Sequence, residues 1–266
     1  MHPQEKGREN MQNKMMKKYF PVFVLPTLLA FTIGFIVPFI MGVYLSFCKF
    51  TTVTDAKFVG LQNYVKIFTE DGTFGHALWY TTAFTVVSVV LINVIGFAVA
   101  LLLTKKIKGT NIFRTVFFMP NLIGGIILGY VWQLLLNGLL LQINKTLTYS
   151  SVYGFWGLVI LMCWQQIGYM MIIYIAGLQN VPDDLIEAAE IDGAGPFKTF
   201  LQVIIPVSKP VFATVFILDY VAYWSDFMWP LLVITDAGKR TVQLGIQTFF
   251  TEPPVYYGPI MAAPTI

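Results

Sequence analysis

The chain has 266 residues, of which 56% are hydrophobic and 12% are charged. Soluble domains carry about 25% charged residues, so this composition excludes an ordinary soluble protein and indicates a chain that lies in a lipid bilayer. The formal net charge of +3 is modest, and we expect no nucleic-acid partner. The two cysteines, Cys48 and Cys163, predict no disulfide framework.

Long windows without acidic or basic residues indicate the membrane spans. A helix needs about 20 apolar residues to cross a hydrocarbon core of about 30 Å. Four such windows cover residues 19–47, 77–104, 115–144 and 146–182. A fifth window, 210–235, is interrupted by Asp219 and Asp226. The final stretch "PPVYYGPIMAAPTI" predicts the start of a sixth helix, truncated at Ile266, so the fold class is an all-α polytopic membrane protein.

The distribution of basic residues predicts the orientation of the chain. Eleven Lys and Arg residues fall in the N-terminal tail, in residues 105–114 and in residues 198–209, and six fall in the intervening loops. Because basic residues accumulate on the cytoplasmic side, the N-terminus is expected to be cytoplasmic. Residues 1–18 then form a cytosolic tail and residues 19–266 a transmembrane domain. Four spans separate the N-terminus from Glu187, which places Glu187 on the cytoplasmic side as well.

The third window carries a helix breaker. In "FFMPNLIGGIILGY", Pro120 lacks a backbone donor and Gly124 and Gly125 loosen the helix. The sequence therefore predicts a kink or a break. Two interpretations stay open: a simple packing kink, or backbone that lines protein or a watery cavity.

A short helix is also predicted between the first two windows. In "FVGLQNYVKIFTED", the apolar residues Leu61, Tyr64, Val65 and Phe68 recur at helical spacing. This pattern is typical of an amphipathic helix that lies at a membrane surface. We expect it on the outer side.

The segment "VPDDLIEAAEIDGAG" is an acidic turn in an otherwise apolar chain. Pro182 followed by Asp183 and Asp184 favours a helix start, because early acids oppose the helix dipole and bind free amides. Gly193 and Gly195 permit the chain reversal that ends a helix. The sequence thus predicts a helix of roughly three turns, too short to be stable in water without a partner.

A second amphipathic helix should follow this turn. In "PFKTFLQVIIPVSKP", an apolar stripe recurs every three or four residues; its members are Phe197, Phe200, Leu201 and Ile204. Pro206 is expected to end the regular hydrogen-bond ladder before the fifth span. A solvated loop would explain the polar residues but not two ordered helices, so we expect residues 182–206 to act as a rigid lever.

These residues carry a specific resemblance. Glu187, Ala188 and Ala189, followed after three residues by Gly193 and after nine more by the run that ends at Pro206, resemble the EAA loop of permease subunits of binding-protein-dependent ABC importers. "PDDLIEAAEIDGAGPFKTF" and "FRTVFFMPNLIGG" are similar to carbohydrate-type permeases, and the long outer loop after the first span resembles the MalF-like half of the pair. The resemblance implies a six-helix type I permease core in which residues 182–206 are the coupling loop.

The resemblance also implies partners. The chain should form a heterodimer with a second permease in the cell membrane, served by two cytosolic ATPase subunits and an extracellular or periplasmic solute-binding protein, with a carbohydrate as substrate. The chain itself has no G-x-x-x-x-G-K-[ST] motif, because "DAGKRT" at residues 236–241 lacks the first glycine. We therefore expect no enzyme activity and no cofactor in this chain, with ATP hydrolysed by the partner subunits.

Polar residues inside the spans predict a substrate site. Asp219, Tyr223 and Asp226 are spaced i, i+4 and i+7, which places them on one face of a helix. In the fourth window, Gln166 and Tyr169 lie three residues apart. Carboxylates and amides suit sugar hydroxyls, and aromatic rings cover the apolar faces of sugar rings. The resemblance implies that positions matching these five line the sugar cavity of maltose-type relatives.

Other interpretations stay open for these residues. Asp226 lies near the outer end of its span, where it can instead meet water or cap a neighbouring helix. A secondary transporter could use Asp219 and Asp226 to couple transport to ions. A membrane-embedded enzyme would need a catalytic constellation, and the sequence offers no Ser/His/Asp set. His2 and His76 lack ligand spacing, so no metal site is predicted.

Overall fold

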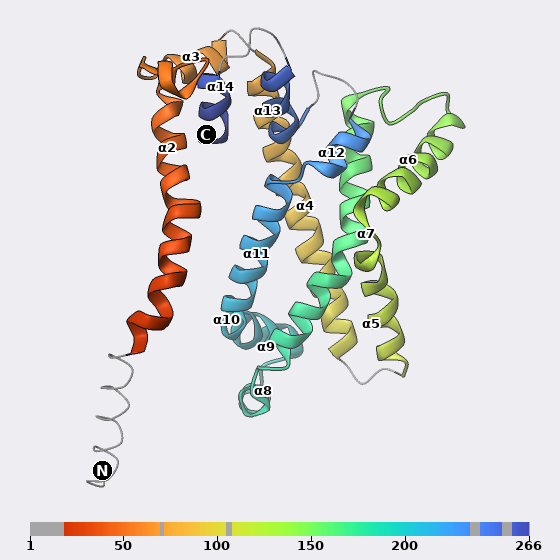
Figure 1. Cartoon of the computed structure of the whole chain (residues 1–266). Coiled ribbons are helices and arrows are strands. Elements are labelled where there is room, and N and C mark those ends of the chain that lie inside the picture. Colours follow the sequence, from red (N-terminus) through yellow and green to blue (C-terminus); the bar gives the residue numbers. More distant parts are fainter. Residues whose placement is uncertain (1–18, 70–71, 105–107, 235–239, 252–256, 266) are drawn as a thin grey trace, which may run out of the picture. The chain divides into compact units, whose positions relative to one another are not determined.

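The computed structural model describes residues 19–69, 72–104, 108–234, 240–251 and 257–265, and these are predominantly helical (Figure 1). The described part also holds one short antiparallel ribbon, β1 (Cys48–Lys49) with β2 (Lys57–Phe58). The predicted all-α class is confirmed. The chain divides into two compact units, residues 72–247 and the combination of residues 1–71 with 248–266.

The predicted spans reappear as long apolar helices. Within the described residues, three helices are long and apolar enough to cross a membrane: Tyr19–Ser46, Phe74–Thr104 and Val152–Leu178. Two bent pairs, Thr110–Leu122 with Gly125–Leu141 and Phe197–Val207 with Lys209–Trp224, raise the number to five if each pair is one span. All five predicted windows therefore match helical segments. The window on Tyr19–Ser46 has no buried residues in the chain alone, as expected of a helix that faces lipid or another protein.

The first unit combines this N-terminal helix with the predicted outer helix. The N-terminal helix contains a π-helical stretch, Thr32–Ile36, and ends as α2 (Val37–Ser46). A single 3-10 turn, Val53–Asp55, lies between the two short strands, and α3 (Gln62–Thr69) follows them. Near the end of the chain α14 (Tyr257–Ala262) packs against α2 and α3 and leads into the 3-10 turn Ala263–Thr265.

The helix α3 confirms the predicted element, but the unit buries a different face. Leu61, just before α3, and Val65 are 64% and 57% exposed, whereas Asn63 and Ile67 are buried. The Asn63 amide donates to the backbone oxygens of Ser46 and Cys48, at 2.8 and 2.9 Å. The predicted apolar stripe therefore remains available to a surface outside this unit.

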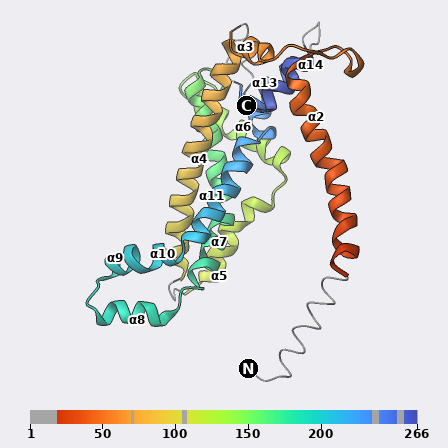
Figure 2. The same ribbon diagram turned by 90° about the vertical axis from the view of Figure 1, so that its left-hand side faces the viewer.

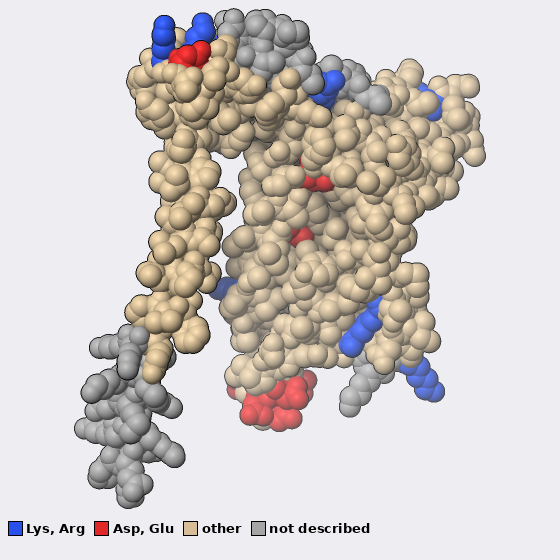
Figure 3. All heavy atoms as spheres, in the orientation of Figure 1, with Lys and Arg blue, Asp and Glu red and all other residues tan. Residues whose placement is uncertain are grey.

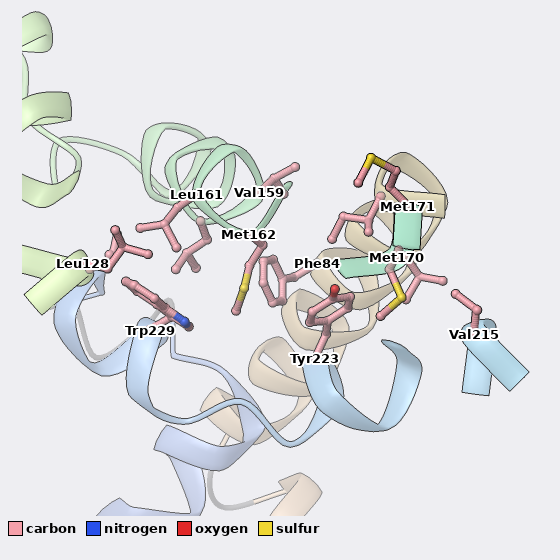
Figure 4. Packing of buried hydrophobic residues seen from close by; sticks show 14 of the residues in the cluster. Phe84, Leu128, Val159, Leu161, Met162, Met170, Met171, Val215, Tyr223 and Trp229 are labelled. Carbon is pink, nitrogen blue, oxygen red and sulfur yellow. The ribbon is translucent and has the colours of Figure 1, made fainter. Parts of the chain in front are cut away.

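The second unit is built around a pair of long helices. α4 (Gly72–Thr104, 33 residues) packs along α7 (Ser151–Leu178), and α11 (Lys209–Trp224) packs against both. Small residues allow these close approaches: a Cβ on Gly96 would lie 3.4 Å from the Ile167 oxygen. Figure 4 shows Phe84 of α4, Met162 of α7 and Tyr223 of α11 pointing toward one another in the core.

The predicted break in the third window is confirmed. α5 (Thr110–Phe118) continues into a 3-10 turn, Met119–Leu122, and α6 (Gly125–Leu141) then departs at 98°. Pro120 lies in the 3-10 turn, and Gly124 is extended at the start of α6. α6 packs against α12 (Met228–Val233), whereas Leu122, Ile123 and Gly124 at the break are exposed in this chain, so both interpretations of the break stay open.

The end of the second amphipathic helix differs from the prediction. α9 (Pro196–Thr199) continues through a π-helical stretch, Phe200–Ile204, into α10 (Ile205–Val207). Pro206 lies inside this run, and the break comes at Ser208, where the chain bends by 68° into α11. The π-helical stretch explains the difference: a wider turn just before a proline leaves room for its ring and for the missing hydrogen bond.

The segment after α12 returns to α4. α13 (Val242–Thr251) begins where the Val242 amide donates to the Thr81 hydroxyl of α4, at 2.8 Å.

Candidate functional site

The acidic turn forms the predicted helix, α8 (Asp183–Ile191), with Pro182 at its N-cap position and both acids in its first turn. Its C-terminus has two closing hydrogen bonds: the Gly193 amide donates to the Glu190 oxygen at 3.0 Å, and the Ala194 amide donates to the Ala189 oxygen at 2.9 Å. This pair of bonds is a Schellman motif, which requires a left-handed residue. Gly193 supplies it, with φ of 72°.

α8 presents its motif residues to the outside of the unit. Figure 2 shows α8 projecting from one end of the helical bundle, and Figure 3 shows acidic side chains gathered at this tip. Glu187 and Ala188 are exposed, and Ala189 is buried at the base. Ile191 and Phe197 are 87% and 75% exposed. A projecting helix with exposed apolar side chains has the character of a surface that another protein covers.

A separate polar cluster lies inside the bundle. The carboxylate of Asp219 accepts a hydrogen bond from the Asn93 amide at 2.7 Å and one from the Tyr223 hydroxyl at 3.1 Å. The Tyr174 hydroxyl donates to the Asn93 oxygen. Asp219 is 0% exposed, and Tyr174 and Tyr223 are nearly as buried. The cluster thus joins α4, α7 and α11.

The remaining predicted site residues are less buried. Gln166 is half-buried on α7, and its oxygen accepts a hydrogen bond from Asn121, in the turn between α5 and α6, at 3.2 Å. Tyr169 is 39% exposed. Next to Gln166, the Gln165 oxygen is buried without a hydrogen-bond partner in the part of the chain that the structure describes.

Asp226 does not share the helical face predicted for it. α11 ends at Trp224, two residues earlier, so the i, i+4, i+7 face holds for Asp219 and Tyr223 and is wrong for Asp226. The Asp226 carboxylate instead accepts hydrogen bonds from backbone amides of residues 227–229, at the start of α12. This matches the alternative that it caps a neighbouring helix. Its Oδ2 atom is buried with no partner among the described residues.

Three residues that hydrogen-bond in the Asp219 and Gln166 clusters were not predicted from the sequence. Asn93, Asn121 and Tyr174 are neutral and occur singly, so nothing in their spacing marks them. The usable signal was weaker: an amide in the middle of an apolar span must find a partner, because unpaired polar groups are costly there. Asn93, in the otherwise apolar "VVLINVIG", meets that criterion.

One basic residue outside the spans has a defined environment. Lys145, in the loop between α6 and α7, donates to the Tyr153 hydroxyl at 3.0 Å and lies 5.1 Å above the centre of the Tyr149 ring. The hydrogen bond with Tyr153 raises the pKa of Lys145. No group of three or more His, Cys, Asp or Glu residues that could hold a metal ion occurs in the described ranges.

Comparison with known proteins identifies the family. Residues 92–265 match the model of the binding-protein-dependent transport system inner membrane component. The chain is 36% identical over 238 residues to a protein of Thermoanaerobacterium thermosulfurigenes named "probable starch degradation products transport system permease protein AmyD", covering 85% of this chain and 80% of that relative. It is 32% identical to the multiple sugar-binding transport system permease protein MsmF of Streptococcus mutans, covering 89% and 85%.

A solved structure has the same fold. The chain resembles one chain of a bacterial alginate ABC transporter, solved in complex with an alginate pentasaccharide-bound periplasmic protein, with a TM-score of 0.75 over 95% of this chain and 90% of that one. The sequence identity is 18%, so this likeness supports the fold alone. With the family match over more than half of its length, the chain belongs to the inner membrane components of binding-protein-dependent transport systems, the permease family that its EAA-like loop resembles.

Proposed function

We propose that this chain is a membrane-spanning permease subunit of an ATP-driven sugar importer, and that its N-terminus is cytoplasmic. The observation that carries the proposal is α8: the Glu187-Ala188-Ala189 motif lies on this projecting helix with Glu187 and Ala188 exposed, and Gly193 forms the turn that closes its C-terminal end. The permease relatives named above are assigned to starch degradation products and multiple sugars, which favours a carbohydrate over other solutes.

The proposed assembly contains a second permease, two cytosolic ATPase subunits and an outer solute-binding protein. α8 would bind in a groove of one ATPase subunit, with Glu187 and Ala188 at the contact and with Ala189, which is buried in its own chain, at the base of the helix. Gly193 and Pro206 would shape the lever behind it. Closure of the ATPase pair would then move α8 and, through the bend at Ser208, the span α11. The chain needs no cofactor of its own in this scheme.

We place the sugar beside Gln166 and Tyr169 of α7 and beside Asp226 at the start of α12, with Asp219 and Tyr223 of α11 as the buried wall of the same site. Two acceptors at these positions, the Gln165 oxygen and Asp226 Oδ2, are buried without partners in the described residues, so a ligand reaches them only in a conformation that opens the pathway. Such atoms are satisfied when a ligand hydroxyl donates to them. The partly exposed ring of Tyr169 offers an apolar surface to a sugar ring.

The first experiment is to tag this chain in its native cell, extract it in mild detergent and identify the proteins that co-purify. We expect a P-loop ATPase and a second permease in near-stoichiometric amounts. A chain that purifies alone and still moves solute down an ion gradient would contradict the importer and favour a secondary transporter driven through Asp219 and Asp226.

A further inference from the structure

The carboxylate of Asp219 is covered on all sides in this conformation. The side chain is 0% exposed, and each of its two oxygens has a donor: Asn93 for Oδ2 and Tyr223 for Oδ1. A solute in the pathway has no access to a carboxylate that is already surrounded by protein. The role of Asp219 in this state therefore lies in its contacts with α4 and α7.

The hydrogen bonds that reach Asp219 have a fixed direction. The Asn93 amide nitrogen donates to Asp219 and, at 2.7 Å, to the Val89 oxygen, while the Asn93 oxygen accepts from Tyr174. These three neighbours determine which way the amide points. Tyr174 thus orients Asn93, and Asn93 in turn binds the carboxylate. Charge-assisted bonds of this kind are stronger than neutral ones, and they matter more where water is excluded.

We propose that Asn93, Tyr174 and Tyr223 form with Asp219 an interhelical clamp, which fastens α11 to α4 and α7, and that transport depends on the Asn93–Asp219 pair itself. Asn93 and Tyr174 are then positioning residues for the transport cycle. The proposal rests on the proposed function in one respect, because its main readout is solute uptake.

The position of the clamp explains why transport would need it. α11 begins at the 68° bend that follows α8, α9 and α10, so a movement of α8 reaches α11 first at its end near Ser208. The clamp lies ten residues further along α11, where Asp219 meets the long helices of the core. A lever needs a fixed point, and without one a displacement at α8 would be absorbed by sliding of α11 alone.

A reciprocal exchange tests the clamp. Asn93→Asp breaks the pair because it opposes two carboxylates, and Asp219→Asn weakens it because the acceptor loses its charge. In the double variant the pair is restored in reverse: Asp at position 93 accepts from Tyr174 and from the new amide at 219, whose oxygen accepts from Tyr223. The charge moves from α11 to α4, and the bond that is not restored is the one from position 93 to the Val89 oxygen, because a carboxylate cannot donate.

The variants are compared with wild type in the complete importer, reconstituted in proteoliposomes. We expect each single change to lower uptake at least about tenfold and to lower the melting temperature by about 3 °C or more, given the strength of charged hydrogen bonds. The double variant should recover both. Recovery of the melting temperature without uptake would overturn the proposal, because it would show that the charge is needed at position 219 itself. Recovery of neither, or single variants with normal uptake, would overturn it as well.

A milder pair of variants covers the case in which the charged variants do not assemble. Tyr174→Phe removes the hydroxyl that orients Asn93 and should lower uptake several-fold without loss of protein from the membrane. Tyr80→Phe is the control, because Tyr80 on α4 also packs edge-on against a phenylalanine, as Tyr174 on α7 does, but is not one of the residues hydrogen-bonded around Asp219. Equal uptake in the two variants would contradict the clamp. If wild type carries no sugar and binds no ATPase, the proposed function fails, but the melting comparison still tests the pair.

Discussion

Gly168 lies where α7 crosses the end of α5, and the two backbones are in direct contact there. A Cβ built on Gly168 would lie 1.8 Å from the Phe117 oxygen and 2.8 Å from the Phe118 nitrogen. The obstacle is backbone, which cannot move aside as the end of a side chain can. Glycine at this crossing is therefore a steric requirement of the bundle.

We predict that Gly168→Ala prevents correct packing of α5 on α7 and reduces the amount of folded protein at least several-fold, since overpacking costs about 1–3 kcal/mol or more. Fluorescence-detected size exclusion of the tagged chain measures this loss. Gly138→Ala on α6 is the control, because a Cβ there meets nothing within 4 Å. A monodisperse Gly168→Ala protein at wild-type yield would contradict the close crossing.

Gly193 is required for a different reason. Its Cβ would meet nothing within 4 Å, but its φ of 72° is unfavourable for any other residue. We predict that Gly193→Pro, whose φ is fixed near −65°, abolishes uptake while the protein still inserts into the membrane. Gly195→Ala should retain uptake, since Gly195 has neither a positive φ nor a close neighbour. Normal uptake by Gly193→Pro would show that the turn after α8 is not part of the coupling element.

Sequence reasoning at this scale succeeded where spacing defines geometry. The separation of Asp219 from Tyr223 placed them on one helical face, and they do bond to each other. It failed for Asp226, because nothing local marks Trp224 as the last helical residue. Asn93 was missed since its importance comes from a partner 126 residues away, and long-range pairing is not visible in a single sequence.

Among the elements, the existence of the helix breaks could be predicted well from the sequence, whereas the residue at which a helix breaks could not. Pro120 and the glycines that follow it mark the 98° bend between α5 and α6. Pro206 suggested an ending that the chain defers to Ser208, because the π-helical stretch Phe200–Ile204 accommodates the proline. The sequence shows which residue disfavours a continuous helix, but the conformation of the neighbouring turns determines at which residue the helix ends.

The element α8 allows a test of the proposed ATPase contact. We predict that Glu187→Lys abolishes uptake and releases the ATPase from the purified complex, because reversal of charge at the contact is more damaging than its loss. Glu187→Gln keeps the shape of the side chain and should retain part of the uptake and part of the ATPase binding. The measurement is ATPase recovered per tagged chain, together with uptake. Full recovery and normal uptake in the Lys variant would exclude Glu187 from the contact.

For the molecule as a whole, composition and window length predicted the class of fold and the set of spans. What they could not provide is which faces of the spans meet, since all are apolar and any pair could pack. The long contact of α4 with α7 depends on small residues such as Gly96 and on single polar residues, details that a hydropathy pattern averages away.

The orientation in the membrane is also a property of the whole chain. We predict that a cysteine in place of Lys198 reacts with a membrane-impermeant maleimide only after the cells are permeabilised, whereas one in place of Thr148 reacts in intact cells. Both positions are exposed, and Cys48 and Cys163 are first replaced by serine. The reverse pattern of labelling would invert the predicted topology.

The length of α4 has a consequence for the lipid. Its 33 residues extend about 50 Å at 1.5 Å per residue, well beyond a hydrocarbon core of about 30 Å. Such a helix must tilt, thicken the bilayer around it or carry its ends into the headgroup region, each at a modest cost per ångström. Since α4 is the main partner of α7 and also packs on α11, a change in its tilt would pass to both. The rate of transport should therefore depend on the acyl-chain length of the lipid. We expect short-chain lipids to increase the tilt of the bundle and to slow transport.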